Sequence, residues 1–245
     1  MLWKESKIKR RALISKMKST VWRVFEPIRT IYAECWLRSP AKLIGKLACN
    51  ECGLGNKYEE RPSPLIIEWE NWGGENKVIG DFTWPSGGRF IVKETVFQKL
   101  NEIFGNLNSG PVEMIGSLKI KNTDSYQGPP LVELMVDKQI PFLPETTAKV
   151  AYRCPTCGRV QRNLIGVELK HERWNKTLEK SVKVHKKRKP GKGLILSESD
   201  IDPEVPFFRV TEFSDAIFCT DSIRILLLSL GLNHLDFLDF GEIKK

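Results

Sequence analysis

The sequence lacks the short motifs that mark the common enzyme classes. It contains no Gly-x-x-x-x-Gly-Lys-Ser/Thr phosphate loop, no Gly-x-Gly-x-x-Gly turn, no His-Glu-x-x-His pair and no Gly-x-Ser-x-Gly elbow. Histidine is scarce, with three residues in 245. We expect His171, His185 and His234 to face solvent, because a general base needs an orienting partner that the sequence does not offer. These absences favour a protein that is not an enzyme.

Long apolar runs are absent too. The longest candidate, Ile225 to Leu230, is far shorter than the roughly 20 apolar residues of a membrane span. The basic residues between Lys4 and Lys18 are not followed by the uninterrupted apolar segment of a secretory signal. Six cysteines in this length are too few for a disulfide scaffold and fit a reducing compartment. We therefore expect a cytoplasmic protein without a membrane span.

Charge is unevenly distributed along an otherwise ordinary composition. Residues 1–48 carry twelve Lys and Arg and three acidic residues, a net charge of +9. The whole chain has the same net charge of +9, so the net charge of residues 49–245 is zero. Within that remainder, residues 170–193 have ten basic and two acidic residues, whereas residues 194–240 have two basic and nine acidic. Such blocks are often solvated faces, or they pair with each other in the fold.

Two short stretches carry the clearest chemistry. Each is a Cys-x-x-Cys-Gly knuckle, in which a tight turn aims two sulfurs at one point and the glycine allows a positive φ. Together they supply the four thiolates of a tetrahedral zinc site. The two knuckles are Cys49-Asn50-Glu51-Cys52-Gly53 and Cys154-Pro155-Thr156-Cys157-Gly158.

We expect one structural zinc ion per chain, because four thiolates leave no open position for catalysis. Two alternatives remain open: separate or intermolecular two-cysteine sites, and redox use of the pairs. The knuckles lie about a hundred residues apart, much farther than in ordinary zinc ribbons. The two remaining cysteines, Cys35 and Cys219, sit among apolar neighbours and are expected to be inert and buried.

The residue patterns predict an α+β fold of mostly antiparallel strands with two principal helices. One helix spans Lys93 to Phe104 and ends at Gly105; the other runs from Thr220 or Asp221 to Leu230 and ends at Gly231. The expected strands are Val21–Glu26, Leu65–Glu70, Arg89–Val92, Val112–Ile120, Leu131–Val136, Lys149–Tyr152, Leu164–Leu169, Phe207–Thr211, Ala216–Cys219 and Leu235–Phe240.

The chain divides into three parts around the knuckles. Residues 1–16 form a basic extension that we expect to be dispensable for the fold. Residues 17–153 hold the first knuckle, and residues 154–245 hold the second knuckle with a basic insert at 170–193. Each half contains a strand, a helix and a strand, and aligning Glu94 with Asp221 superposes their apolar positions. Either an internal duplication or two unrelated amphipathic helices explains this.

The order of these features resembles the bacterial double-CXXCG motif family. The resemblance rests on the strand Val21–Glu26, the two knuckles and the closing segment from Phe207 to Phe237, and it covers roughly residues 17–240. It implies a zinc-containing immunity protein that occludes a toxin delivered by the cell's own kin. Residues 1–16 and 170–193 depart from the family pattern.

Two charged segments are candidates for binding such a toxin. An acidic loop would suit a basic nuclease, whereas a basic run would suit an acidic toxin. The alternative function is a basic zinc-ribbon protein that binds nucleic acid through residues 1–16 and 180–192. The acidic candidates are Glu198, Asp200, Asp202 and Glu204; the basic ones are Lys186, Lys187, Arg188 and Lys189.

Overall fold

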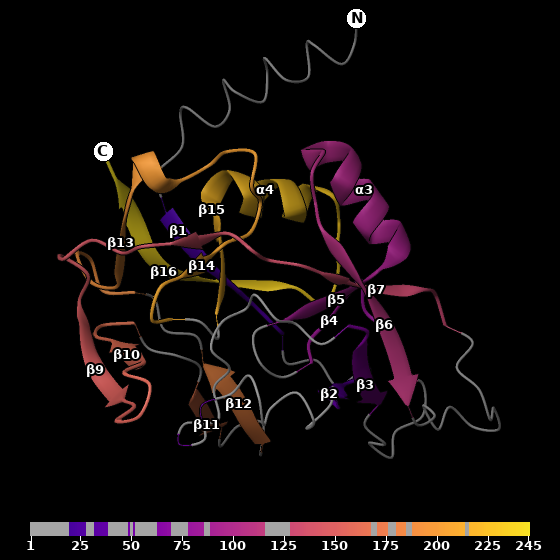
Figure 1. Cartoon of the computed structure of the whole chain (residues 1–245), viewed down its shortest axis with the longest axis horizontal. Coiled ribbons are helices and arrows are strands. Elements are labelled where there is room, and N and C mark those ends of the chain that lie inside the picture. The colour runs from indigo at the N-terminus through magenta and orange to yellow at the C-terminus, as the bar shows by residue number, and fades with distance from the viewer. Residues whose placement is uncertain are drawn as a thin grey trace, which may run out of the picture.

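A computed structural model describes residues 20–27, 32–38, 49, 51, 63–69, 78–85, 89–115, 128–167, 171–175, 180–184, 188–213 and 216–245. These residues form an α+β fold of mostly strands, with two α-helices along one side (Figure 1), which confirms the predicted fold class. The helices are α3 (Glu94–Phe104) and α4 (Asp221–Ser229), and a short 3-10 helix, η1, spans Glu198–Asp200.

The strands form two larger sheets and three two-stranded pairs. The six-stranded sheet has the order β2 (Cys35–Leu37), β3 (Leu65–Trp69), β6 (Ser109–Ile115), β7 (Leu131–Leu134), β5 (Phe90–Lys93) and β4 (Phe82–Thr83). The four-stranded sheet has the order β13 (Leu194–Ser197), β16 (Asp236–Lys244), β1 (Thr20–Phe25) and β15 (Ile217–Thr220). The pairs are β9 (Ala148–Arg153) with β10 (Val160–Leu164), β11 (His171–Asn175) with β12 (Lys180–Val184), and β14 (Arg209–Val210) with β8 (Gln139–Ile140).

Helix α3 follows from its sequence pattern. Val96, Leu100 and Phe104 are spaced by four residues, so they share one face of the helix, and all three are buried. Gly105 then adopts φ 87° and donates its N–H to the Asn101 carbonyl, which ends the helix as predicted. Burial of this stripe fixes the helix on the core.

The two sheets share one arrangement of strands. Helix α3 links β5 to β6, and β7 lies between those strands, antiparallel to both; likewise α4 links β15 to β16, and β1 lies between them. On the far side β3 adds parallel to β6, and β13 adds parallel to β16. Such a shared topology is what an internal duplication would produce, which is one of the two explanations that the sequence leaves open. The sheets differ in two respects: the central strand β1 precedes its unit in the chain, and β2 and β4 extend the first sheet alone.

Both units contribute to one of the hydrophobic clusters of the core. Phe90 and Leu100 come from the first unit and Ile217 and Leu227 from the second, and all four belong to one buried cluster. The two halves are therefore packed together rather than separate. None of the helices in the described part of the chain has the length and apolar character needed to cross a membrane.

One predicted strand is wrong. Leu164–Leu169 was expected to be extended because it is rich in apolar residues, but β10 ends at Leu164. Gly166 follows with φ 78°, in the left-handed region, and turns the chain away from the strand direction. The strand belongs instead to the segment directly after the second knuckle.

The expected exposure of His234 is also wrong, since the residue is 2% exposed. Its Nδ1 lies 2.7 Å from the carbonyl oxygen of Phe82 and therefore donates to it, and Nε2 lies 3.3 Å from a carboxylate oxygen of Glu26. The ring stacks on Tyr32 with centroids 4.2 Å apart. Its partners come from distant parts of the chain, so local sequence did not reveal them. His185 and the side chain of His171 lie outside the described part of the structure.

Candidate metal centre

The second knuckle forms the tip of the hairpin β9–β10. The N–H of Cys154 donates to the Arg159 carbonyl at 2.8 Å, and the N–H of Gly158 donates to the Cys154 carbonyl at 3.0 Å. Gly158 has φ 71°, as expected for the glycine of a knuckle. The local sequence thus folds into a tight turn with both cysteines on it.

This turn favours the charged form of one thiol. The pKa of Cys154 is lowered from 9.0 to about 6, chiefly because the backbone N–H of Cys157, and then that of Thr156, donate to its sulfur. Hydrogen bonds with the side chains of Cys157 and Cys49 contribute to this lowering, while burial acts in the opposite direction. Because the thiolate is the form that binds metals, Cys154 is prepared for coordination at neutral pH.

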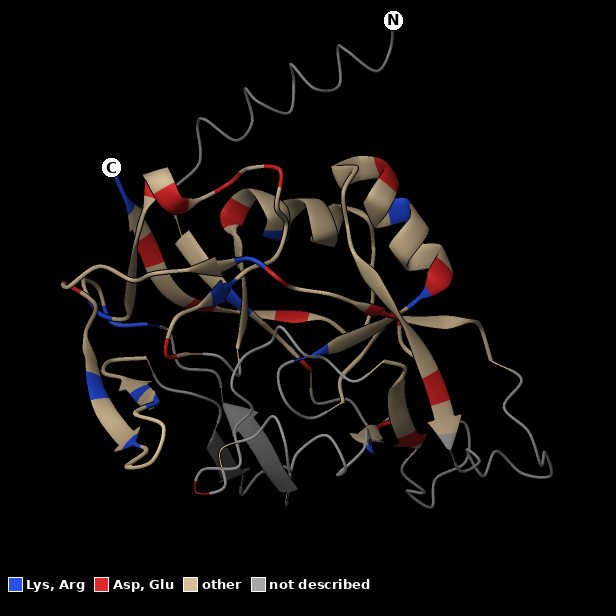
Figure 2. Cartoon of the chain, in the orientation of Figure 1, with Lys and Arg blue, Asp and Glu red and all other residues tan. Residues whose placement is uncertain are grey.

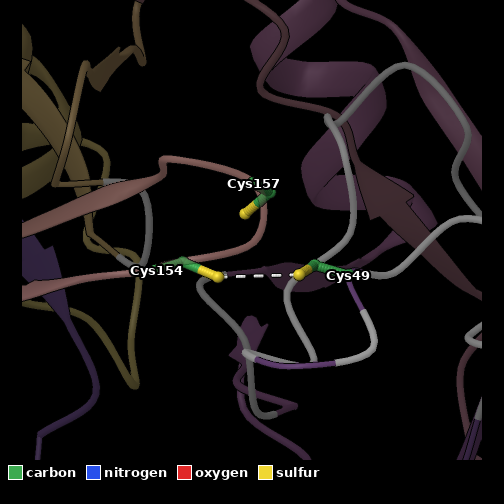
Figure 3. Close-up of side chains that lie close together, drawn as sticks. All are labelled: Cys49, Cys154 and Cys157. Carbon is green, nitrogen blue, oxygen red and sulfur yellow. Dashed lines mark hydrogen bonds between the residues drawn. The ribbon is translucent and has the colours of Figure 1, made fainter.

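The first knuckle reaches the same place from 105 residues away. The sulfur of Cys49 lies 3.6 Å from that of Cys154, and the sulfurs of Cys49, Cys154 and Cys157 all lie within 4.8 Å of one another (Figure 3). In a tetrahedron with bonds of about 2.3 Å, the sulfurs would be about 3.8 Å apart. The three thiols therefore form a cluster that can hold a metal ion.

The cluster joins residues of different exposure. Cys154 is buried, Cys49 is half-buried and Cys157 is exposed, so the site opens to solvent on the side of Cys157. Cys52, the fourth expected ligand, lies outside the described residues.

The two other cysteines have a different environment. Cys35 and Cys219 are buried, as expected from their apolar neighbours. Burial, and secondarily the charge of Glu26, raises the pKa of Cys35 to about 12. Burial also raises the pKa of Cys219. Both thiols stay protonated and unreactive at neutral pH.

The acidic loop begins in η1, which contains Glu198 and Asp200, and lies on the surface (Figure 2). Glu198, Asp202 and Glu204 are exposed, and Asp200 is half-buried. A carboxylate oxygen of Asp202 accepts the N–H of Glu204 at 2.9 Å, which stabilises the turn. The loop therefore displays three carboxylates to solvent.

The predicted basic run is only partly described. Lys186 and Lys187 lie outside the described residues, and Lys189 is exposed. The Arg188 guanidinium donates to Asp239 at 2.7 Å and to the Lys192 carbonyl at 2.8 Å, and its side chain is 10% exposed. Arg188 thus contributes to the fold more than to the surface.

Two cations that were not among the expected site residues, Lys149 and Arg153, are exposed on β9 next to the knuckle. The sequence did carry a signal for a positively charged surface here, because residues 146–167 contain no Asp or Glu.

No family model matches this sequence, and no curated protein matches it.

Proposed function

We propose that the two knuckles hold one structural zinc ion per chain, with Cys52 as the fourth ligand. The observation that supports this is the convergence of three thiols within 4.8 Å from two distant Cys-x-x-Cys motifs. Cys52 shares the first motif with Cys49, and thiolates select zinc over harder cations. Four thiolates would close the coordination sphere, so the metal would act as a clasp and not as a catalyst.

We further propose that the chain is a non-catalytic immunity protein that binds and neutralises a cognate bacterial toxin. This proposal rests on the resemblance of the knuckles and the closing segment to the double-CXXCG motif family. The exposed carboxylates of the acidic loop would suit a toxin with a basic active site, since complementary charge speeds association. Neutralisation would then require only that the bound chain cover that active site.

Native mass spectrometry, with and without a strong chelator, tests the metal site. We expect one zinc per monomer, lost together with the folded charge states on chelation, because structural zinc contributes folding free energy. Cys52→Ser should lower zinc occupancy, whereas the matched control Cys35→Ala should keep it. A metal-free monomer with a disulfide inside either knuckle would instead favour the redox alternative.

Co-expression with the cognate toxin tests the immunity function. The wild-type chain should restore growth and co-purify with the toxin; if it does neither, the immunity proposal is wrong. Changing the four acids of the loop to amides should weaken binding, whereas the same change at four exposed acids elsewhere should not. The control positions are Glu102, Glu113, Asp137 and Glu145. If both variants bind the toxin equally well, the acidic loop is not the binding surface, but the immunity function itself is not rejected.

A further inference from the structure

Positive charge is concentrated around the second knuckle. Residues 146–193 contain fourteen Lys and Arg against three acidic residues, a net charge of +11. Residues 49–145 and 194–245 together carry −11, so the two parts of the folded chain differ in sign. Where such cations gather on a surface, they produce a positive field that attracts polyanions.

Strand β9 displays part of this charge. Every residue from Lys149 to Arg153 is exposed, so neither face of the strand is used to build the core. The register with β10 shifts by one residue at Ala151, which pairs with no residue of β10. Paired residues lie on the same face of a sheet, so Lys149 and Tyr152 lie on one face of β9, and Val150 and Arg153 lie on the other. Val150 and Tyr152 are 47% and 38% exposed. In the described part of the chain β9 pairs with β10 alone, and it lies at the margin of the molecule (Figure 1).

Two further cations are attached to the base of this hairpin. The N–H of Lys189 donates to the Gly166 carbonyl at 3.0 Å, directly after β10. Lys192 packs against the same glycine, since a Cβ built at Gly166 would lie 2.7 Å from the Cβ of Lys192. Both lysines are exposed. Figure 2 shows the blue segments on β9, on β10 and in the turn beside them.

Two arginines near the hairpin form ion pairs, whereas the other cations lie in segments without acids. Arg162 pairs with Glu212 and Arg188 pairs with Asp239. No Asp or Glu occurs in residues 146–167 or 188–193. In the described part of the chain Lys149, Arg153, Lys189 and Lys192 form no ion pair, so their positive charge is not neutralised there.

We propose that this surface, here called the hairpin face, binds single-stranded nucleic acid through its phosphates. The name covers both exposed sides of β9 and the turn beside the hairpin: Lys149, Tyr152, Arg153, Lys189 and Lys192. Its cations would contact the backbone, and the exposed Tyr152 ring offers a platform on which an unpaired base can stack. Stacking and phosphate contacts are insensitive to base identity, so recognition is independent of sequence. This activity goes beyond the immunity function and does not rest on it.

Fluorescence anisotropy with the full chain tests the proposal. The probes are labelled oligouridylate and oligothymidylate of about 20 nucleotides, titrated at salt concentrations from about 50 to about 200 mM. The test variant changes four cations of the hairpin face to Gln. The matched control changes four exposed lysines elsewhere, so both variants lose the same net charge and keep residues 1–16. The control positions are Lys99, Lys138, Lys244 and Lys245.

Four phosphate contacts would give a salt slope of about −2.8 for a single strand, which is about a 50-fold loss of affinity over that salt range. The test variant should lose this slope and bind more than tenfold more weakly at the lowest salt, while the control changes little. Tyr152→Ala should weaken binding about fivefold or more, as expected for one stacked base. Tighter binding of RNA, or equal binding of RNA and DNA, agrees with the proposal.

Three results would overturn it. The wild-type chain could fail to bind either probe at the lowest salt. The control could weaken binding as much as the test variant, which would assign the effect to net charge. Polyglutamate of equal charge could compete better than the oligonucleotides, which would assign the hairpin face to an acidic protein. Circular dichroism and zinc content, measured on each variant, separate loss of binding from loss of folding.

Discussion

Gly158→Ala probes whether the shape of the second knuckle controls metal affinity. Gly158 has φ 71°, and a Cβ built there meets no atom within 4 Å. The cost is therefore one of backbone conformation alone, about 1–2 kcal/mol for a left-handed residue other than glycine. The reduced freedom of the unfolded chain offsets about 0.4–1 kcal/mol of it, which leaves roughly 1 kcal/mol.

Gly105→Ala is the matched control. Gly105 has φ 87° and the same open surroundings, but it ends helix α3 instead of a knuckle. Urea unfolding should show a similar small loss of stability for both variants. Competition with a chromogenic chelator should show weaker zinc binding for Gly158→Ala alone, by about tenfold if the strain falls on the bound turn. Equal zinc affinity of the two variants would refute the coupling between knuckle geometry and metal.

The remaining predictions concern the core, the thiols and pH. Leu100→Ala should cost about 2–5 kcal/mol in thermal unfolding because the side chain is fully buried, whereas Leu228→Ala, at 52% exposure, should stay within about 0.5 kcal/mol. Titration with a thiol reagent at neutral pH should leave Cys35 and Cys219 unmodified until the protein unfolds, because burial raises both pKa values. The pKa of Cys154 is lowered to about 6, so its contribution to stability is present above 9.0, the ordinary thiol value, and is lost as pH falls through about 6. Acid titration without a chelator should therefore release zinc at or below a pH of about 6. Zinc release that does not depend on pH would contradict this prediction.

Features set by neighbouring residues were predictable from the sequence. The stripe Val96, Leu100 and Phe104 and the terminal Gly105 defined α3 to within one residue, because both signals lie inside the helix. The knuckle turn was predictable for the same reason, since its geometry follows from five consecutive residues. Convergence of the two knuckles was predictable from chemistry, because a pair of thiolates alone does not complete a zinc site.

Features set by distant neighbours were not predictable in the same way. The burial of His234 depends on Phe82 and Gly80, more than 150 positions earlier. A Cβ at Gly80 would lie 2.4 Å from the Cβ of His234, so the close approach itself needs a glycine that the local pattern did not mark. The apolar run that begins at Leu164 does not continue as a strand, because Gly166 has a positive φ and turns the chain.

The order of the strands explains how the two halves of the chain hold each other. Strand β1 lies between β15 and β16 in the second sheet, although it precedes the first unit in the chain. The second sheet therefore cannot form without residues 20–25. Contacts with α4 secure this strand: the Trp22 indole donates to Asp221 at 2.9 Å, and the Arg224 guanidinium lies 4.1 Å from the Trp22 ring centroid. The proposed zinc site adds a second link between the halves, because Cys49 precedes the first unit and Cys154 precedes the second. Loss of the metal would therefore loosen the knuckles and the β9–β10 hairpin first, while β1 still ties the sheets together.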